Sequence, residues 1–301
     1  MRALNTCLNH ITTDYKWTIE SICKVNCELL VGTRLEQQGG KLRKTQNWIG
    51  GNRVNPVGAV YVPPEPENVT QLMEDLVVFL NTTQLPPIAA AALAHAQLET
   101  IHPFADGNGR CGRALIHMVF KAAGLARTTV PPVSLILATD KERYIANLSA
   151  YRSENSGSYL EACNNWIEYF SNAVLLSCEK AEAFEKELSS IKVGWTKKMK
   201  FRAGSAGSLL LDVLPGTPAI SIKTAQALTN RSYPAARSAV LALQEAGILY
   251  QNSKNRKSGI YVAHEILNAF NSYERVLATS AGDTSVEKPK RPVPQRHKSG
   301  N

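Results

Sequence analysis

The segment HPFADGNGRCGR, residues 102–113, decides how the rest of the chain is interpreted. Its three glycines fit the G-x-G-x-x-G pattern of loops that bind dinucleotides. Such a loop must follow a buried strand and precede, by about twenty residues, an acid that binds the ribose. Residues 88–101 instead combine many alanines with helical spacing, and the first acidic residue after Arg113 is Asp140. The context therefore excludes a dinucleotide-binding fold.

The segment is better explained as a loop between two helices. Gly107, Asn108 and Gly109 can bring backbone N–H groups close to an anion, and a helix beginning near Arg110 points its positive end into the same loop. Arg110 and Arg113 lie one turn apart at that end, where two cations disfavour folding unless an anion binds. A polyphosphate is the natural ligand of such a loop.

Two further residues of the segment indicate chemistry. Asp106 would repel a bound phosphate unless a cation bridges the two, and Mg²⁺ takes one or two carboxylates together with phosphate oxygens. His102 supplies a group that can accept a proton near neutral pH. Base, metal ligand, anion loop and arginines together predict a phosphoryl- or nucleotidyl-transfer site.

Outward from this segment, most of residues 1–190 has helical spacing of apolar residues. A hairpin with a short β-prone run is expected over residues 43–62. The expected helices cover residues 18–31, 69–80, 88–101, 110–124, 141–150 and 159–184.

The C-terminal third has a different pattern. A helix after residue 209, helices over 222–228 and 234–246, and strands over 248–250 and 259–262 around a basic loop predict a winged helix-turn-helix. The predicted domains are residues 1–195 for the helical core, 196–208 for a linker, 209–270 for the winged helix and 271–301 for a basic, disordered tail.

Composition is that of a globular protein. The 301 residues carry a formal charge of +9, which permits contact with nucleic acid, acidic proteins or polyphosphates. No apolar run approaches the ~18 residues of a membrane helix and no signal peptide is evident, so a cytoplasmic location and no membrane contact are expected. The six cysteines are expected to be reduced, and Cys23 and Cys27 to be buried helix positions rather than metal ligands.

A family resemblance follows from these residues. HPFADGNGRCGR matches, at every defined position, the signature HPFx[DE]GNGRxxR of the Fic (filamentation induced by cAMP) domain family. QNWIGG resembles the flap hairpin of that family, AALAHAQLETIHPF the helix that leads into the motif, and the winged helix a common C-terminal partner domain. The resemblance covers roughly residues 15–265. It implies a mainly α fold, a Fic-type helical bundle with a β-hairpin flap followed by a small winged helix-turn-helix domain.

The resemblance also implies an activity, that of a protein adenylyltransferase (AMPylator). AMP would pass from Mg-ATP to a Ser, Thr or Tyr hydroxyl of a target protein, with His102 as general base, Phe104 as a buried anchor and Asp106 as the Mg²⁺ ligand. ATP phosphates would contact Gly107, Asn108, Gly109, Arg110 and Arg113. The adenine and ribose pocket would include Tyr144, Ile145 and Arg152. The flap that aligns the target would consist of Thr45, Gln46, Asn47, Trp48, Ile49, Gly50 and Gly51.

The sequence departs from the family in one respect. Many members carry an inhibitory helix with the pattern [ST]xxxE[GN], and the nearest segment here, Thr70 to Glu74, is followed by Asp75. An uninhibited enzyme is expected, or one whose inhibitory segment lies outside this chain or on a separate partner. Three alternatives stay open: transfer of UMP or GMP, a nucleotide-sensing regulator that binds DNA through the winged helix, and a homodimer.

Overall fold

The computed structural model describes residues 6–52, 54–126, 131–153, 158–251 and 259–278. The chain divides into two compact units, residues 1–177 and 178–301. The helix α8, Tyr159–Lys198, contributes residues to both.

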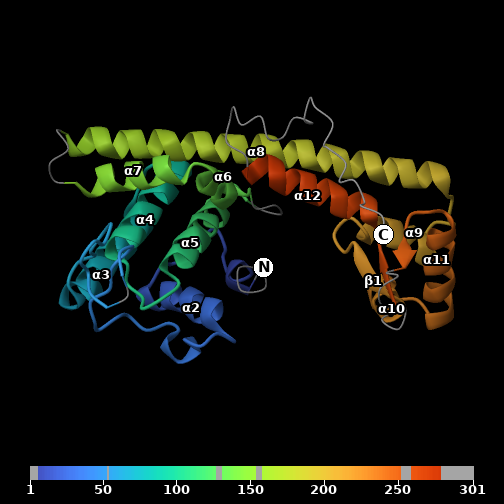
Figure 1. The fold of residues 1–301 in the computed structure, drawn as a ribbon, viewed down its shortest axis with the longest axis horizontal. Helices are drawn as coiled ribbons and strands as arrows, with labels where there is room; N and C mark the ends of the chain where they lie inside the picture. Colours follow the sequence, from blue (N-terminus) through green and yellow to red (C-terminus); the bar gives the residue numbers. More distant parts are fainter. Residues whose placement is uncertain (1–5, 53, 127–130, 154–157, 252–258, 279–301) are drawn as a thin grey trace, which may run out of the picture. The chain divides into compact units, whose positions relative to one another are not determined.

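The N-terminal unit is built around α4, Pro87–Ile101, which lies between α3, Val69–Thr82, and α5, Asn108–Ala122 (Figure 1). Alanines on several sides of α4 are buried, and such small side chains let neighbouring helices approach closely. Trp166 of α8 donates a hydrogen bond from Nε1 to the carbonyl of Ala92, at 2.8 Å. Further helices of this unit are α2 (Ile19–Leu30), α6 (Val133–Thr139), α7 (Lys141–Arg152) and the short 3₁₀ helices η1 (Glu36–Gln38) and η2 (Pro66–Asn68).

Local sequence explains where several of these helices begin. Thr18 and Ser21 form a capping box at the start of α2, and the Asp140 side chain accepts from the backbone of Arg143 at the start of α7. Pro87 occupies the first position of α4, where its missing N–H is not needed. The predicted helices over 18–31, 69–80, 88–101 and 141–150 are therefore confirmed, whereas α6 was not predicted.

The predicted hairpin is less regular than expected. Among the described residues of this segment, a single antiparallel bridge joins Ile49 to Tyr61, with Ile49 N–H donating to the Tyr61 carbonyl at 2.9 Å. Gly50 follows with a φ of 80°, and a Cβ there would lie 2.7 Å from Val60 Cγ2. Only glycine can make so close a turn, which explains the Gly-Gly pair. Residue 53 lies outside the described residues.

The C-terminal unit combines short helices with a small sheet. Three antiparallel strands have the order β1-β3-β2, with Ile220 opposite Tyr261. The predicted helices over 222–228 and 234–246 are confirmed within one residue, while β1 was missed because three residues carry no readable alternation. The predicted basic loop, 252–258, lies outside the described residues. The elements are α9 (Ala206–Val213), β1 (Ala219–Ser221), α10 (Ile222–Thr229), α11 (Tyr233–Glu245), β2 (Tyr250–Gln251), β3 (Ile260–Val262) and α12 (His264–Ala278).

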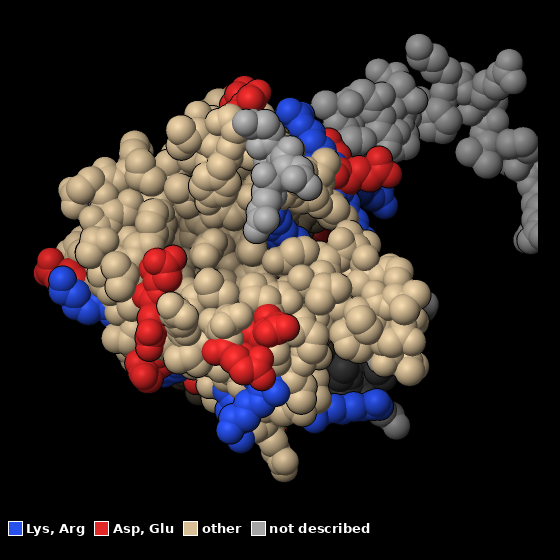
Figure 2. All heavy atoms as spheres, turned by 90° about the vertical axis from the view of Figure 1, so that its left-hand side faces the viewer, with Lys and Arg blue, Asp and Glu red and all other residues tan. Residues whose placement is uncertain are grey.

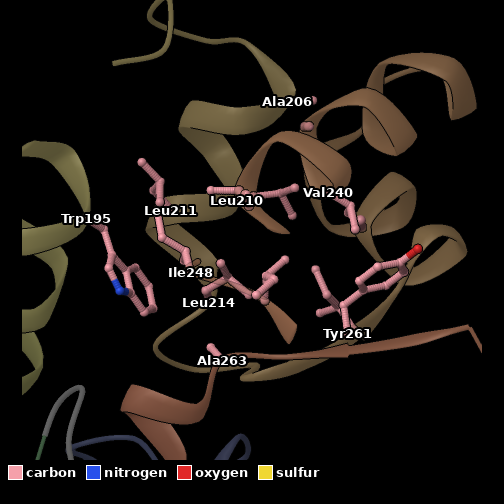
Figure 3. Close-up of a cluster of buried hydrophobic side chains, with 14 of the residues drawn as sticks. Trp195, Ala206, Leu210, Leu211, Leu214, Val240, Ile248, Tyr261 and Ala263 are labelled. Atoms are coloured by element: carbon pink, nitrogen blue, oxygen red, sulfur yellow. The ribbon is translucent and has the colours of Figure 1, made fainter. Parts of the chain in front are cut away.

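Figure 3 shows the apolar core of this unit, which gathers Leu210, Leu214, Val240 and Tyr261 around the sheet. Trp195, which the sequence analysis assigned to the helical core, is fully buried in this cluster and donates from Nε1 to Glu265 Oε2 at 2.7 Å. The predicted linker, 196–208, likewise begins as helix, because α8 ends at Lys198 and α9 starts at Ala206.

The predicted tail needs a correction, because residues 271–278 are helical and complete α12. Phe184 stacks on Tyr273 with ring centroids 4.3 Å apart and also contacts Phe270, and Leu277 is buried. These aromatic and aliphatic contacts outweigh the polar composition that predicted disorder. Residues 279–301 lie outside the described residues.

Surface and cysteine features limit some functional classes. Among the described helices, none is both long and apolar enough to span a bilayer. The face seen in Figure 2 carries basic and acidic side chains in small mixed groups, so the positive charge is not gathered there. All six cysteines are free thiols; Cys23 is half-buried and Cys27 is exposed, so the prediction that both are buried is wrong for Cys27.

Candidate active site

The motif begins where α4 ends. His102 adopts a left-handed conformation, with φ 50° and ψ 56°, and its N–H still donates to the carbonyl of Leu98 at 2.9 Å. The chain then turns through Phe104, whose side chain is fully buried, as expected for an anchor. Asn108 closes the turn: its Oδ1 accepts from Phe104 N–H at 2.8 Å and its Nδ2 donates to the Phe104 carbonyl at 2.7 Å. The Asn108 side chain therefore holds the loop, which leaves only its backbone for a ligand.

The amino end of α5 is open. The helix starts at Asn108, two residues earlier than predicted, after Gly107 with a φ of 83° and no capping side chain. Within the described part of the chain, no hydrogen bond reaches the N–H groups of residues 107–110. Asn26 of α2 donates from Nδ2 to the Asp106 carbonyl at 2.9 Å and so anchors the loop to that helix. Unpaired N–H groups at a helix start form an anion site.

The charged residues of the motif lie around this open end. Asp106 and Arg110 form an ion pair at 3.0 Å, with both side chains about half exposed. Arg110 also donates to the carbonyl of Leu29 at 3.3 Å. Arg113 is exposed and places Nη1 3.2 Å from the position that a Cβ of Gly109 would occupy. The two arginines thus contact different neighbours rather than acting as one pair.

His102 is prepared to accept a proton. Burial, helped by the guanidiniums of Arg152 and Arg43, lowers its pKa to about 4, although the backbone of Glu99 and the charge of Asp106 act in the opposite direction. The imidazole is therefore neutral at pH 7. Its Nδ1 is enclosed and has no hydrogen-bond partner among the described residues, so Nε2 is the nitrogen left for a substrate proton.

A second polar group lies behind the motif. A hydrogen bond of 2.9 Å joins His95 Nε2 to the Tyr144 hydroxyl, and the His95 ring stacks on Trp166. Its Nδ1 and Glu99 Oε1 are both buried without a partner among the described residues. A Cβ at Gly112 would lie 2.9 Å from His95 Nδ1 and 2.8 Å from Glu99 Oε1. Only glycine at position 112 lets these two side chains lie so close to α5, because a Cβ would collide with them. Burial raises the pKa of the Glu99 carboxyl.

The residues predicted to contact adenine and ribose do not all line one cavity of the described chain. Tyr144 lines a small cavity of about 150 Å³ together with His95, Arg113 and Lys141. Arg152 does not line it, but lies over the Tyr61 ring at 4.0 Å. Ile145 is half-buried and is also absent from the described lining.

Among the predicted flap residues, Asn47 contacts the motif. Asn47 Nδ2 donates to the carbonyl of Phe104 at 3.0 Å, and Gln46 Nε2 to that of Pro63 at 2.8 Å. The carbonyl of Thr45 accepts from Arg43 at 3.4 Å. Residues 46–48 and 50–52 line an open pocket of about 430 Å³.

Two residues at the site were missed by the sequence analysis. Arg43 is only 5% exposed, and Tyr61 donates from its hydroxyl to the Thr100 carbonyl at 2.9 Å. Arg43 lies in a run of basic residues with Lys41 and Lys44, and no spacing in the sequence distinguishes it from them.

Known proteins resemble this chain in sequence over the same region. A model of the Fic/DOC family matches residues 16–120. Protein adenylyltransferase fic-1 of Caenorhabditis briggsae is 34% identical over 142 residues, which cover 45% of this chain and 25% of that protein. Protein adenylyltransferase Fic of Drosophila grimshawi is 39% identical over 97 residues, 31% of this chain and 18% of that protein. The chain thus matches a quarter or less of the length of these relatives.

One solved structure gives the likeness in fold. The crystal structure of a Fic family protein from Desulfovibrio desulfuricans G20 aligns with a TM-score of 0.51 at 19% identity. The alignment covers 87% of this chain and 72% of that one. At this identity the likeness concerns the fold alone.

Proposed function

We propose that this chain is a protein adenylyltransferase that transfers AMP from ATP to a hydroxyl of a target protein, because residues 16–120 match a model of the Fic/DOC family. The observation that carries the proposal is the juxtaposition of a neutral, half-buried His102 with the open amino end of α5. A base and an anion site within one short loop are what transfer of a nucleotidyl group requires.

In this mechanism each group has one task. The N–H groups of Gly107, Asn108 and Gly109 bind phosphate oxygens, and Arg110 and Arg113 offset further negative charge. His102 Nε2 takes the proton of the target hydroxyl as its oxygen bonds to the α-phosphorus. The bond from that phosphorus to the pyrophosphate oxygen breaks, so pyrophosphate leaves.

The residues present fit Mg²⁺ as the cation. Magnesium binds oxygen and usually keeps waters, taking one or two carboxylates plus substrate phosphates. Asp106 offers one exposed carboxylate next to the open N–H groups. No group of three or more His, Cys, Asp or Glu side chains suited to a metal occurs among the described residues, so we propose that ATP phosphates supply the remaining ligands. When bound, the ion would reduce the negative charge of the phosphates.

The flap would align the target. An extended segment can pair with the backbone of residues 45–51, a mode of recognition that tolerates many sequences. The open pocket along this segment supports the proposal. Tyr144, Ile145 and Arg152 remain proposed contacts of the adenine and ribose.

The test uses Mg²⁺ and ATP labelled at the α-phosphate. We expect the wild-type chain to leave label covalently on itself or on added proteins, and His102→Ala to lower that rate by about 10²- to 10⁴-fold. His10→Ala changes an exposed histidine and should label like the wild type. Equal labelling by His102→Ala would refute the role of the base, and labelling from UTP or GTP alone would change the donor.

The C-terminal unit supports a second candidate, a regulator that binds DNA. We propose that its helices and small sheet form a winged helix, since α10, a short turn and α11 precede β2 and β3. The exposed cations Lys223 and Arg237, on α10 and α11, favour contact with DNA phosphates, whereas Tyr233 and Glu245 of α11 suit a protein partner. Salt-dependent duplex binding without AMP transfer would favour the regulator.

A further inference from the structure

The carboxyl end of α4, directly before His102, is held by side chains from outside the helix. Arg152 Nη2 donates to the carbonyl of Glu99 at 2.9 Å, and the Tyr61 hydroxyl donates to that of Thr100 at 2.9 Å. A helix leaves its last carbonyls without intrahelical partners, and this end carries partial negative charge. Each partner here comes from a different part of the chain.

Arg43 completes this arrangement. Its Nε donates to the carbonyl of His102 at 2.9 Å and its Nη2 to that of Ile101 at 3.3 Å. The same guanidinium reaches both sides of the flap, because it also donates to the carbonyls of Thr45 and Pro64. One buried side chain thus joins the end of α4 to Thr45, the first residue of the flap, and to Pro64, which follows it.

The burial of Arg43 calls for an explanation. Its side chain takes part in none of the ion pairs found among the described residues, and burial lowers its pKa. A buried cation without a carboxylate is costly unless several acceptors satisfy it, and only the planar fork of arginine reaches this many carbonyls. The neighbouring His102 has a φ of 50°, which residues other than glycine keep only when their surroundings hold them.

We propose that Arg43 is a positioning residue that fixes the backbone of His102 and the flap in one arrangement. The inference rests on the proposed function for its kinetic part. None of the hydrogen bonds of the Arg43 side chain reaches residues 106–113, so phosphate binding does not depend on it. Arg43 therefore acts on the orientation of the base and on the target segment, and not on ATP.

The first experiment compares Arg43→Met and Arg43→Lys with Arg34→Met, which changes an exposed arginine of the same unit. Misplacing a catalytic group by about 1 Å costs up to about 100-fold. We expect Arg43→Met to lower kcat by about 10- to 100-fold, and the Kd of ATP to stay within about twofold, since Arg43 does not reach the phosphate-binding residues. Arg43→Lys should also lower kcat, because an ammonium cannot satisfy four carbonyls. Unchanged kcat in both variants would overturn the proposal.

The second measurement does not depend on activity. His102 faces three charged groups, Arg43 and Arg152 as cations and Asp106 as an anion. A titration of the imidazole by NMR, over the pH range in which the protein stays folded, should show a higher pKa for His102 in Arg43→Met than in the wild type. Arg43→Lys keeps the cation and should leave that pKa unchanged while kcat falls.

These readouts separate the two proposals. A wild-type chain that transfers no label refutes the adenylyltransferase but leaves the NMR comparison intact. A wild-type chain that transfers label, with unchanged kcat and unchanged His102 pKa in Arg43→Met, refutes the role of Arg43 alone. If Arg43→Met fails to fold by circular dichroism, Arg43→Lys decides: wild-type kcat in that variant overturns the inference.

Discussion

Two helix ends meet at residues 102–108, and the protein treats them in opposite ways. The carbonyls at the end of α4 are paired with Arg152, Tyr61 and Arg43. The N–H groups at the start of α5 have no partner among the described residues. The protein thus uses its own cations and hydroxyl on the negative end and keeps the positive end free. The difference teaches that the paired end fixes geometry, while the unpaired end is where an anion can bind.

Among the changes considered, acidification is expected to lower the unfolding free energy most, through three buried histidines of α4, α5 and the loop between them. Burial lowers the pKa of His95, His102 and His117 to about 4, whereas an unfolded histidine titrates near 6.5. Their contribution to stability is therefore complete above pH 6.5 and is lost as pH falls toward 4, because only the unfolded chain takes up the protons. Each histidine can lower the unfolding free energy by up to about 1.4 kcal/mol per pH unit of acidification. Urea unfolding at pH 7 and pH 5 measures the loss.

His117→Gln is the matching variant, because His117 is buried on α5 away from the loop. It should reduce the loss on acidification by about one third, since one of three comparable groups is removed. Equal stability of the wild type at pH 7 and pH 5 would contradict the prediction.

Asn108 tests how far the open end depends on the loop that supports it. Asn108→Ala removes both hydrogen bonds to the buried backbone of Phe104 and should cost about 2–4 kcal/mol of unfolding free energy. Asn108→Asp keeps the acceptor for Phe104 N–H, but it sets a second, negatively charged oxygen against the buried Phe104 carbonyl, so at pH 7 it should cost at least as much as Asn108→Ala. Chemical denaturation of both variants checks the order; a clearly smaller loss in Asn108→Asp would be the contrary result.

Gly112 tests the space between the two helices. Gly112→Ala brings a Cβ within 3 Å of Glu99 Oε1 and His95 Nδ1, and overpacking of this kind costs about 1–3 kcal/mol. Gly194→Ala, in α8, meets no atom within 4 Å and should instead stabilise by about 0.5–1 kcal/mol. Thermal melting of the two variants should shift in opposite directions, and a rise for Gly112→Ala would show that the helices can separate.

Asp106 gives the smallest effect on stability. Its ion pair with Arg110 is half exposed, so Asp106→Asn should change the unfolding free energy by about 0.5 kcal/mol or less. The same variant should require more Mg²⁺ for half-maximal labelling if Asp106 is the metal ligand. A large loss of stability would contradict this prediction, because it would show that Asp106 holds the folded loop together.

The parts of the site that lie close together in sequence were predictable. The motif residues fall within one loop, and their chemistry can be inferred from their order, as can α2 from Thr18 and α4 from its alanines. Arg43 and Tyr61 could not be found, because they reach α4 across about 40 to 60 residues and long-range contacts leave no local spacing. The polar composition of residues 271–278 predicted disorder, but these residues are helical because Tyr273 packs against Phe184.

The paired side chain of Asn108 has a consequence for the chemical lifetime of the protein. Asn followed by Gly is a dipeptide prone to deamidation, because the glycine N–H can attack the side-chain carbonyl when the backbone is free to turn. Here Asn108 and Gly109 lie in the first turn of a helix, and both polar atoms of the amide are engaged by Phe104. The folded state therefore protects Asn108 from deamidation. Each time the chain unfolds, the side-chain amide becomes open to this reaction, which refolding cannot reverse.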